Sequence, residues 1–312
     1  MHQSPPRSMR SQECTIVVVA LNGGANLAEC LDALLAQGAP CLVMLGAGME
    51  SAIWQRRYPS IRFVESAASV PARRIQGMEA AGTAVVGLLE DSSVPGPHWF
   101  GAVRDGFESD KVAAVGGPVT IGHHIGARQQ ALGCCEFGRY HPALVRALAR
   151  ARSKDGSGAF AVDRLPGNNI AYRRSAIRAV TDSRAPLVET LLNAELRAAR
   201  FDLVLDPAMT VDYRPQGAGG VRWIDRYRHG RLYGGNRVAD QSLPGRALSM
   251  IRALLLPFVL SGRSLRGMGR AIPVRAWWKV GPLVCWMETA WAVGEAAGTI
   301  AGVGRGIEDW KA

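Results

Sequence analysis

Two adjacent acids follow a run of apolar residues in the first third of the chain. Glu90 and Asp91 come directly after residues 84–89, a segment whose composition predicts a buried strand. Ligands of open α/β sheets bind beyond the carboxyl ends of the strands, where paired carboxylates are suited to holding a hard divalent cation on phosphates. The alternative is a solvated turn in which Asp91 caps the next helix.

A third acid stands near the start of a predicted helix over residues 186–200. Its apolar positions recur at helical spacing, at Leu187, Leu191, Leu192 and Leu196. Glu189 falls in the first turn, where the helix dipole favours an acid in any case. Taken alone, Glu189 is either a dipole-stabilised acid or a functional one.

Polar residues also gather in the segment 166–174. Asn168 and Asn169 follow Gly167, a pattern typical of a turn. Arg173 and Arg174 then open a helix, from which guanidinium groups could face a diphosphate. The segment is a candidate part of a site that binds an anionic substrate.

Alternating strands and helices must position these groups. The pattern predicts strands over residues 15–20, 41–45, 61–64, 84–89 and 112–115, and helices over 27–37, 49–58, 70–81 and 95–107. Repeated βα units predict an α/β fold with a doubly wound, mostly parallel sheet. The loops 21–26, 46–48 and 90–94 should then lie together at the carboxyl edge of that sheet.

Several classes of protein are excluded by what the sequence lacks. Neither GxxxxGK[ST] nor GxGxxG follows a predicted strand, which argues against P-loop ATPases and Rossmann dehydrogenases. The six cysteines form no CxxC pair, so a zinc ribbon is not indicated. No nucleic-acid-binding module is recognisable, and we expect no nucleic-acid partner.

The net charge of +11 lies almost entirely in one segment. Residues 214–279 hold 13 basic side chains against Asp225 and Asp240. Such a cluster beside apolar sequence is typical of proteins that bind an anionic membrane surface. Most of the basic residues are Arg, which indicates a GC-rich bacterial genome.

The apolar sequence near this cluster predicts membrane association. Residues 253–260 are too few to span a bilayer, and residues 280–303 carry Glu288 and Glu295 on one helical face. Small residues recur every fourth position and let another helix approach closely, at Gly294, Gly298 and Gly302. Aromatic residues suited to a membrane interface accompany them, at Trp277, Trp278, Trp286 and Trp291. The alternative is a helical hairpin that closes a soluble core.

Together these motifs resemble glycosyltransferase family 2, whose members have the GT-A fold. Residues 15–22 resemble the opening strand and its nucleotide-contacting loop, and residues 88–99 resemble the acidic motif with its Pro–Trp tail. Residues 167–174 resemble the acceptor-side segment, and residues 189–207 resemble the helix that begins with the catalytic acid. The resemblance covers about residues 14–235.

The resemblance implies a role for each candidate residue. Glu90 and Asp91 would hold Mg²⁺ or Mn²⁺ on the diphosphate of a nucleotide-sugar co-substrate, and Glu189 would be the catalytic base. Further donor contacts are assigned to Ala20, Asn22, Arg74, Asn168, Asn169 and Arg173. The chain departs from the family pattern at the end of the second strand, where residues 45–48 lack the usual Asp, and at the second metal-ligand position, which is Ser92. Tyr213 stands in place of the usual His, and the base position holds Glu189 rather than the usual Asp.

The resemblance also gives an expected organisation. We expect a disordered N-terminus over residues 1–13, a GT-A nucleotide-diphospho-sugar transferase domain with a mixed sheet over 14–235, and a helical, membrane-associated region over 236–312. An inverting transfer from a nucleotide-sugar donor to a glycan or lipid-linked acceptor is expected, at the cytoplasmic face of a bacterial inner membrane. The alternatives are a catalytically decayed GT-A scaffold and, with less support, a sugar nucleotidyltransferase.

Overall fold

The computed structural model describes residues 13–21, 23–122, 125–152, 158–181, 188–215, 223–239, 241 and 243–304. It divides into two compact units. The sheet unit contains residues 1–120 and 142–214 with the last two residues, and the helical unit contains residues 121–141 and 215–310. The predicted disordered terminus, apart from Glu13, lies outside the described residues.

An eight-stranded mixed sheet forms the centre of the sheet unit, with the strand order β3-β2-β1-β4-β9-β6-β10-β8. In chain order its strands are β1 (Cys14–Val19), β2 (Cys41–Leu45), β3 (Arg62–Glu65), β4 (Val85–Glu90), β6 (Val112–Gly116), β8 (Phe160–Val162), β9 (Asn169–Arg173) and β10 (Asp202–Leu205). The central strands are rich in Val, Ile and Leu and are buried on both faces, as parallel strands covered by helices require. The predicted α/β architecture is confirmed.

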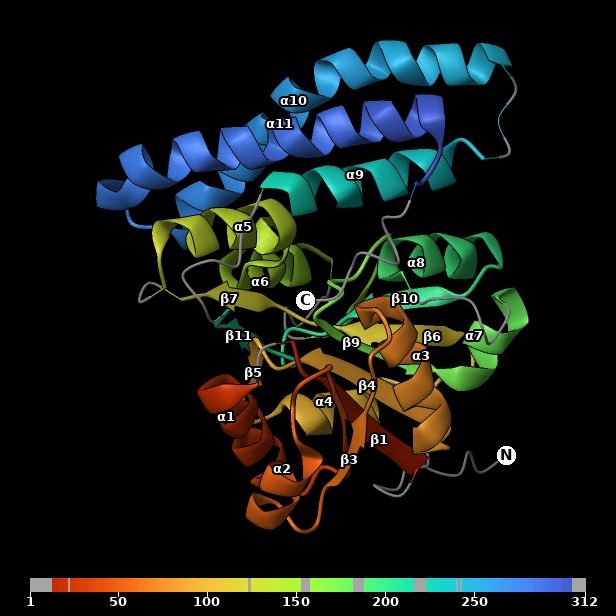
Figure 1. Cartoon of the computed structure of the whole chain (residues 1–312), viewed down its shortest axis with the longest axis vertical. Coiled ribbons are helices and arrows are strands. Elements are labelled where there is room, and N and C mark those ends of the chain that lie inside the picture. Colours follow the sequence, from red (N-terminus) through yellow and green to blue (C-terminus); the bar gives the residue numbers. More distant parts are fainter. Residues whose placement is uncertain are drawn as a thin grey trace. The chain divides into compact units, whose positions relative to one another are not determined.

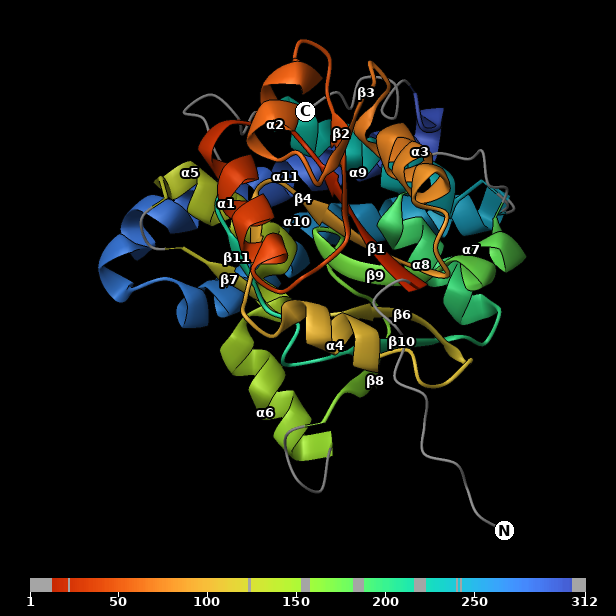
Figure 2. The same cartoon turned by 90° about the horizontal axis from the view of Figure 1, so that it is seen from below.

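Helices follow the strands as the βα pattern predicts (Figures 1 and 2). They are α1 (Gly24–Leu35), α2 (Ser51–Arg57), α3 (Val70–Ala81), α4 (Trp99–Asp105), α6 (Pro142–Arg152), α7 (Arg174–Val180) and α8 (Glu189–Ala198). A second sheet has the order β5-β11-β7 and joins β5 (Ser93–Pro95), β11 (Val211–Tyr213) and β7 (Val119–Ile121). It places the residues after the acidic motif beside the end of β11.

Strand β9 runs antiparallel between β4 and β6, which the βα pattern does not predict. In its register with β4, Asn169 faces Leu89 and Arg173 faces Val85. Asn169, at the start of β9, therefore lies beside the carboxyl end of β4. Arg173, at the end of β9, lies beside the amino end of β4. This direction decides which residues of the segment 166–174 can reach the acidic motif.

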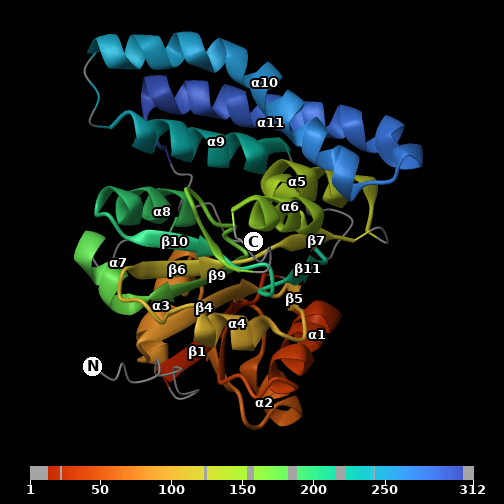
Figure 3. The ribbon, with the colours of Figure 1, turned by 180° about the vertical axis from the view of Figure 1, so that it is seen from behind.

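The helical unit is built on α5 (Ala127–Phe137), α9 (Trp223–Arg237), α10 (Leu243–Ala271) and α11 (Trp277–Ala301). Within it α11 lies between α9 and α10 (Figures 1 and 3). The division differs from the predicted boundary at residue 235, because α9 and α5 pack on α11. Residues 127–152 form helices α5 and α6 with a short 3₁₀ turn between them.

Glycines bring the backbones of α9 and α11 into direct contact. A Cβ added at Gly294 would stand 2.0 Å from the carbonyl oxygen of Tyr227, and one at Gly298 would stand 2.1 Å from that of Arg231. On the facing helix, Gly230 leaves the same room for Trp291. The predicted close approach of another helix to the glycine ridge of α11 is confirmed, and α9 is that helix.

The two carboxylates of α11 share one face, as predicted, and that face is buried. Glu288 accepts hydrogen bonds from Ser264 (2.6 Å) and Arg226 (3.3 Å), and Glu295 pairs with Arg237 (2.8 Å). Across the described ranges, no helix combines the length and apolarity needed to cross a membrane.

Candidate active site

Asp91 of the acidic motif forms hydrogen bonds with the end of β1 and with the loop that follows it. The Asp91 N–H donates to the carbonyl oxygen of Val19 (3.2 Å), and Asp91 Oδ2 accepts the N–H of Gly23 (2.7 Å). Gly23 has a φ of 68°, which a side chain would disfavour. Asp91 is only 1% exposed. It therefore fixes the loop in which a nucleotide-contacting role was predicted.

Arg74 of α3 joins two of the predicted acids. Its Nη2 lies 2.6 Å from Oε1 of Glu90, and its Nη1 forms an ion pair with Glu189. Burial works against the charge of this guanidinium, but Glu189 and Glu90 outweigh it, so the pKa of Arg74 lies above its ordinary value. The structure thus brings together Glu90, Asp91, Arg74 and Glu189, although they come from positions up to 115 residues apart in the sequence.

Glu189 is the first residue of α8, as the sequence predicts. A Cβ added at Gly167 would stand 3.0 Å from its Cδ and 3.2 Å from both carboxylate oxygens. The helix is held by Asn193, which accepts from the Tyr172 hydroxyl (3.1 Å) and donates to the Leu165 carbonyl (3.4 Å). Because of the short distances at Gly167, a larger residue at that position would displace the Glu189 carboxylate.

Burial sets the protonation of Glu189. It raises the pKa of this carboxyl from 4.5 to about 7, while Arg74 and the backbone oppose the rise and Glu90 supports it. A carboxylate that titrates near neutral pH is matched to a general base. A dipole-stabilised surface acid would be exposed, whereas Glu189 is 7% exposed.

Asn168 connects the turn before β9 to the second sheet. Its Nδ2 donates to Ser93 Oγ (3.0 Å), and the side chain is buried. Its Oδ1 is buried without a hydrogen-bond donor among the described residues. An unsatisfied buried acceptor costs about 1–3 kcal/mol, which a hydroxyl of a bound ligand would relieve.

The other polar residues of this segment do not face the acidic motif. Asn169 is fully buried, accepts from Trp99 Nε1 (2.7 Å), and donates to the carbonyls of Pro118 (3.1 Å) and Met209 (2.7 Å). Its amide is used inside the protein, so the predicted donor contact is not supported.

Arg173 is also misplaced for the predicted diphosphate contact. Its guanidinium donates to the carbonyls of Val112 (3.1 Å), Phe107 (2.9 Å) and Ser109 (3.0 Å). Arg174 likewise donates to the Thr83 carbonyl (3.2 Å). Both arginines lie at the amino end of β4, because β9 runs antiparallel to it, roughly 17 Å of strand from the acids.

Two further donor contacts were predicted in the first loop. Ala20 is buried, and its carbonyl accepts from Arg73 Nη1 (2.7 Å), whereas Asn22 lies outside the described residues. Arg73 was not among the predicted site residues, although its guanidinium also approaches Gly46. Burial lowers its pKa, and the carboxylates of Asp91 and Glu90 oppose this. The available signal was its place on the buried face of the predicted helix 70–81.

The carboxylates at this edge already bind other groups of the protein. Asp91 accepts a backbone N–H, and Glu90 is paired with Arg74. The family's further ligand positions hold Ser92 and Tyr213, which carry no charge. In the part of the chain that the structure describes, no three His, Cys, Asp or Glu side chains are grouped to hold a metal ion. The residues present do not fit a resident divalent cation, so the geometry does not support the predicted metal role.

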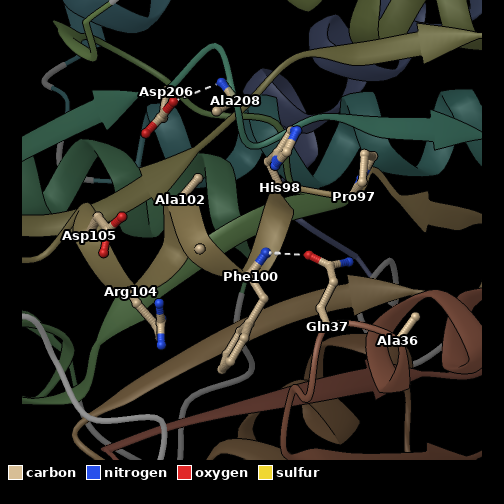
Figure 4. A pocket seen from close by; sticks show the side chains of 11 residues that line it. Ala36, Gln37, Pro97, His98, Phe100, Ala102, Arg104, Asp105, Asp206 and Ala208 are labelled. Atoms are coloured by element: carbon tan, nitrogen blue, oxygen red, sulfur yellow. Dashed lines mark hydrogen bonds between the residues drawn. The ribbon is translucent and has the colours of Figure 1, made fainter.

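A shallow hollow of about 520 Å³ lies elsewhere in the sheet unit, between the end of α1, the start of α4 and the turn after β10 (Figure 4). Its wall includes Gln37, which accepts the Phe100 N–H (2.9 Å), and Asp206, which accepts the Ala208 N–H (2.8 Å). It contains none of the predicted site residues. The cluster of Glu90, Asp91, Arg74 and Glu189 therefore lies outside this hollow.

Comparisons with known proteins support the predicted family. A family model described as "Glycosyltransferase like family 2" matches residues 11–185, more than half of the 312 residues. A search of curated proteins found no matching relative.

Two solved structures share the fold. The mannosyltransferase PcManGT from Pyrobaculum calidifontis, in complex with GDP-Man and Mn²⁺, is 14% identical with a TM-score of 0.55, over 93% of this chain and 87% of that chain. S. aureus TarS, in complex with UDP-GlcNAc, is 10% identical with a TM-score of 0.52, over 86% and 78%. At these identities the likeness shows the fold alone. Family match and fold together show that this chain belongs to glycosyltransferase family 2 and has the GT-A fold.

Proposed function

We propose that the sheet unit catalyses inverting transfer of a sugar from a nucleoside-diphosphate sugar to a hydroxyl acceptor. Glu189 takes the proton of the acceptor hydroxyl while that oxygen forms a bond to the anomeric carbon. The bond from this carbon to the diphosphate oxygen breaks, and its electron pair leaves with the nucleoside diphosphate. Attack opposite the leaving group inverts the anomeric centre.

The observation that carries this proposal is the environment of Glu189. A buried carboxylate with a pKa of about 7 is ionised in much of the population at neutral pH, yet basic enough to accept a proton. Arg74 orients it through an ion pair, and Gly167 leaves its carboxylate oxygens room. Arg74 is a positioning residue in this mechanism.

Donor recognition is proposed for the loop and side chains around Asp91. The Asp91–Gly23 hydrogen bond shapes the turn after β1, and Arg73 places a positive charge beside the ends of β1 and β2. Asn168 offers a buried acceptor for a hydroxyl. The structural relatives bind GDP-Man and UDP-GlcNAc, which supports a nucleotide-sugar donor here. No step is assigned to a cation, because the carboxylates present do not fit one.

The acceptor in this proposal is a hydroxyl of a glycan or of a lipid-linked glycan. A membrane-borne acceptor is supported by the exposed apolar and basic side chains of the helical unit. Because attachment to a membrane limits an enzyme to nearby substrates, a surface-bound acceptor would be the one it meets most often.

The test combines a panel of nucleotide sugars with the variant Glu189→Gln, with release of nucleoside diphosphate as the readout. Gln keeps the shape of the side chain but cannot take the proton, so transfer should fall by roughly 10²- to 10⁴-fold with donor binding retained. The matched control is Glu195→Gln, the same change on the exposed face of α8. Equal turnover in the wild type and Glu189→Gln would overturn the proposal.

A catalytically decayed member of the family is the second candidate. Ser92, Tyr213 and the Arg74–Glu90 pair favour it, since each departs from a metal-dependent site. The same panel separates the two, because a decayed protein would bind donors without releasing nucleoside diphosphate.

A further inference from the structure

Exposed apolar side chains are concentrated in the helical unit. Among the described residues, three large exposed apolar side chains belong to the sheet unit, namely Leu35, Ile53 and Leu148. The described part of the helical unit has ten, namely Trp223, Leu255, Phe258, Val259, Val274, Trp277, Trp278, Trp286, Val293 and Ile300. Nine of these lie on α10, α11 or the turn between them. Exposed apolar surface gathered in this way marks a binding surface.

Helix α11 has two unlike faces. One face is buried and carries Glu288, Glu295 and the glycines that contact α9. The opposite face is exposed and carries Trp278, Trp286, Val293 and Ile300, which follow one another at intervals of eight, seven and seven residues. Such intervals keep side chains on one side of a helix. Trp278, at 71% exposure, and Trp286 are of the type found at membrane–water interfaces.

Helix α10 has an exposed stripe of a similar kind. Leu255, Phe258 and Val259 are exposed, Phe258 at 77%. The exposed residues Arg252 and Arg263 stand on either side of them in the sequence. Apolar side chains between arginines are typical of a helix that lies in the plane of a membrane surface, its apolar side among the acyl chains and its charges at the headgroups.

The charged side chains of α10 and the first part of α11 are all positive up to Met287. Residues 241–287 contain seven basic side chains and no acidic one. Six are exposed, at Arg252, Arg263, Arg266, Arg270, Arg275 and Lys279. The basic residues of α9 are used differently, since Arg226 and Arg237 bind the buried carboxylates of α11. The exposed basic side chains of residues 241–287 therefore lie on the same helices and turn as the exposed apolar side chains.

We propose that α10 and α11 bind the surface of a bilayer that contains anionic phospholipids, with both helices lying along the surface. Apolar contact and electrostatic attraction act together, and two such signals give stable attachment where one gives only weak binding. A folded protein partner would be expected to present acids to these arginines, but the exposed apolar side chains, from Leu255 on α10 to Ile300 on α11, are distributed along both helices, which suits a fluid surface better.

The experiment is co-sedimentation of the full chain with vesicles of phosphatidylcholine alone or mixed with phosphatidylglycerol. The chain should sediment with the anionic vesicles at low salt and much less with neutral ones. The variant Arg263→Gln/Arg266→Gln/Arg270→Gln should weaken binding to anionic vesicles roughly a hundred-fold. The variant Phe258→Ser/Trp278→Ser should weaken it by about ten-fold or more.

A matched control is Ile53→Ser/Leu148→Ser, which removes exposed apolar side chains from the sheet unit. It should bind vesicles like the wild type. Failure of the full chain to sediment with anionic vesicles would overturn the proposal, as would equal loss in the control variant. The proposal would also fall if the Phe258/Trp278 variant kept vesicle binding and instead abolished self-association of the chain without lipid. Transferase activity is not needed for any of these readouts.

Discussion

The two units of this protein use buried charge in opposite ways. In the sheet unit, Arg74, Glu90 and Glu189 meet at one edge of the sheet, and burial there moves the pKa of Glu189 to about 7. In the helical unit, Arg226 lies between Glu136 (3.1 Å) and Glu288 (3.3 Å), and these ions join one helix to the next. The first group has a carboxyl whose pKa lies near neutral pH, and the second has its charges paired inside the protein.

The two units also differ in how far their large apolar side chains are buried. The sheet unit buries its large apolar residues around the strands, whereas the helical unit leaves many of them exposed on α10 and α11. The two proposals made above follow this difference, since they assign catalysis to the sheet unit and membrane attachment to the helical unit. Substitutions in the sheet unit should therefore change transferase activity and leave membrane binding unchanged, and substitutions on the exposed faces of α10 and α11 should do the reverse.

The largest effect on stability is expected from Gly294→Ala in the helical unit. The new Cβ would stand 2.0 Å from the backbone oxygen of Tyr227, so α9 and α11 must move apart. Overpacking of this kind costs about 1–3 kcal/mol, which thermal unfolding measures. Gly262→Ala on α10 is the control, because a Cβ there meets nothing within 4 Å. Equal melting temperatures for the two variants would contradict the glycine contact.

A smaller and purely kinetic effect is expected from Gly167→Ala in the sheet unit. The added methyl would press on the carboxylate of Glu189 at 3.0–3.2 Å, so the base must shift by a few tenths of an ångström. Because misplaced catalytic groups are costly, turnover should fall about ten-fold or more while the melting temperature changes little. Gly101→Ala on α4, with no atom within 4 Å, is the control. Unchanged turnover in Gly167→Ala would contradict the role of Glu189 as the catalytic base.

The smallest effect is expected from metal removal. Asp91 is bound to Gly23 and Glu90 to Arg74, so we expect no resident cation for a chelator to remove. Nucleoside diphosphate release in excess chelator should therefore stay close to its value with added Mn²⁺. Complete loss of release, restored by Mn²⁺, would show that the carboxylates rearrange to bind metal with the donor.

Much of this arrangement could be predicted from the sequence. Local patterns predict the bounds of α3 and β2, and the apolar run before Glu90 predicts the edge at which the site forms. A helix over residues 186–200 with Glu189 in its first turn was also predicted, because apolar spacing and an acid in the first turn are both local signals, and α8 begins at Glu189 itself.

Contacts between distant segments could not be predicted in this way. The direction of β9 depends on which strands it pairs with, so the sequence does not reveal that Arg173 lies at the far edge and Asn169 in the core. The basic cluster gave the same difficulty, since Arg226 finds its partner Glu136 90 residues earlier in the chain. The sequence shows the total charge of the basic cluster, but it does not show which arginines form buried ion pairs and which are exposed.

The central claim is that Glu189 is a base tuned by burial and by Arg74, and a pH–rate profile tests it most directly. Since the protonated carboxyl cannot accept a proton, kcat/KM of the wild type should rise with pH and level off above about 7. Arg74 lowers the pKa of Glu189, so Arg74→Gln should move the rise to higher pH. A wild-type profile that is flat from pH 5 to 8, or an Arg74→Gln profile with an unmoved midpoint, would contradict the account.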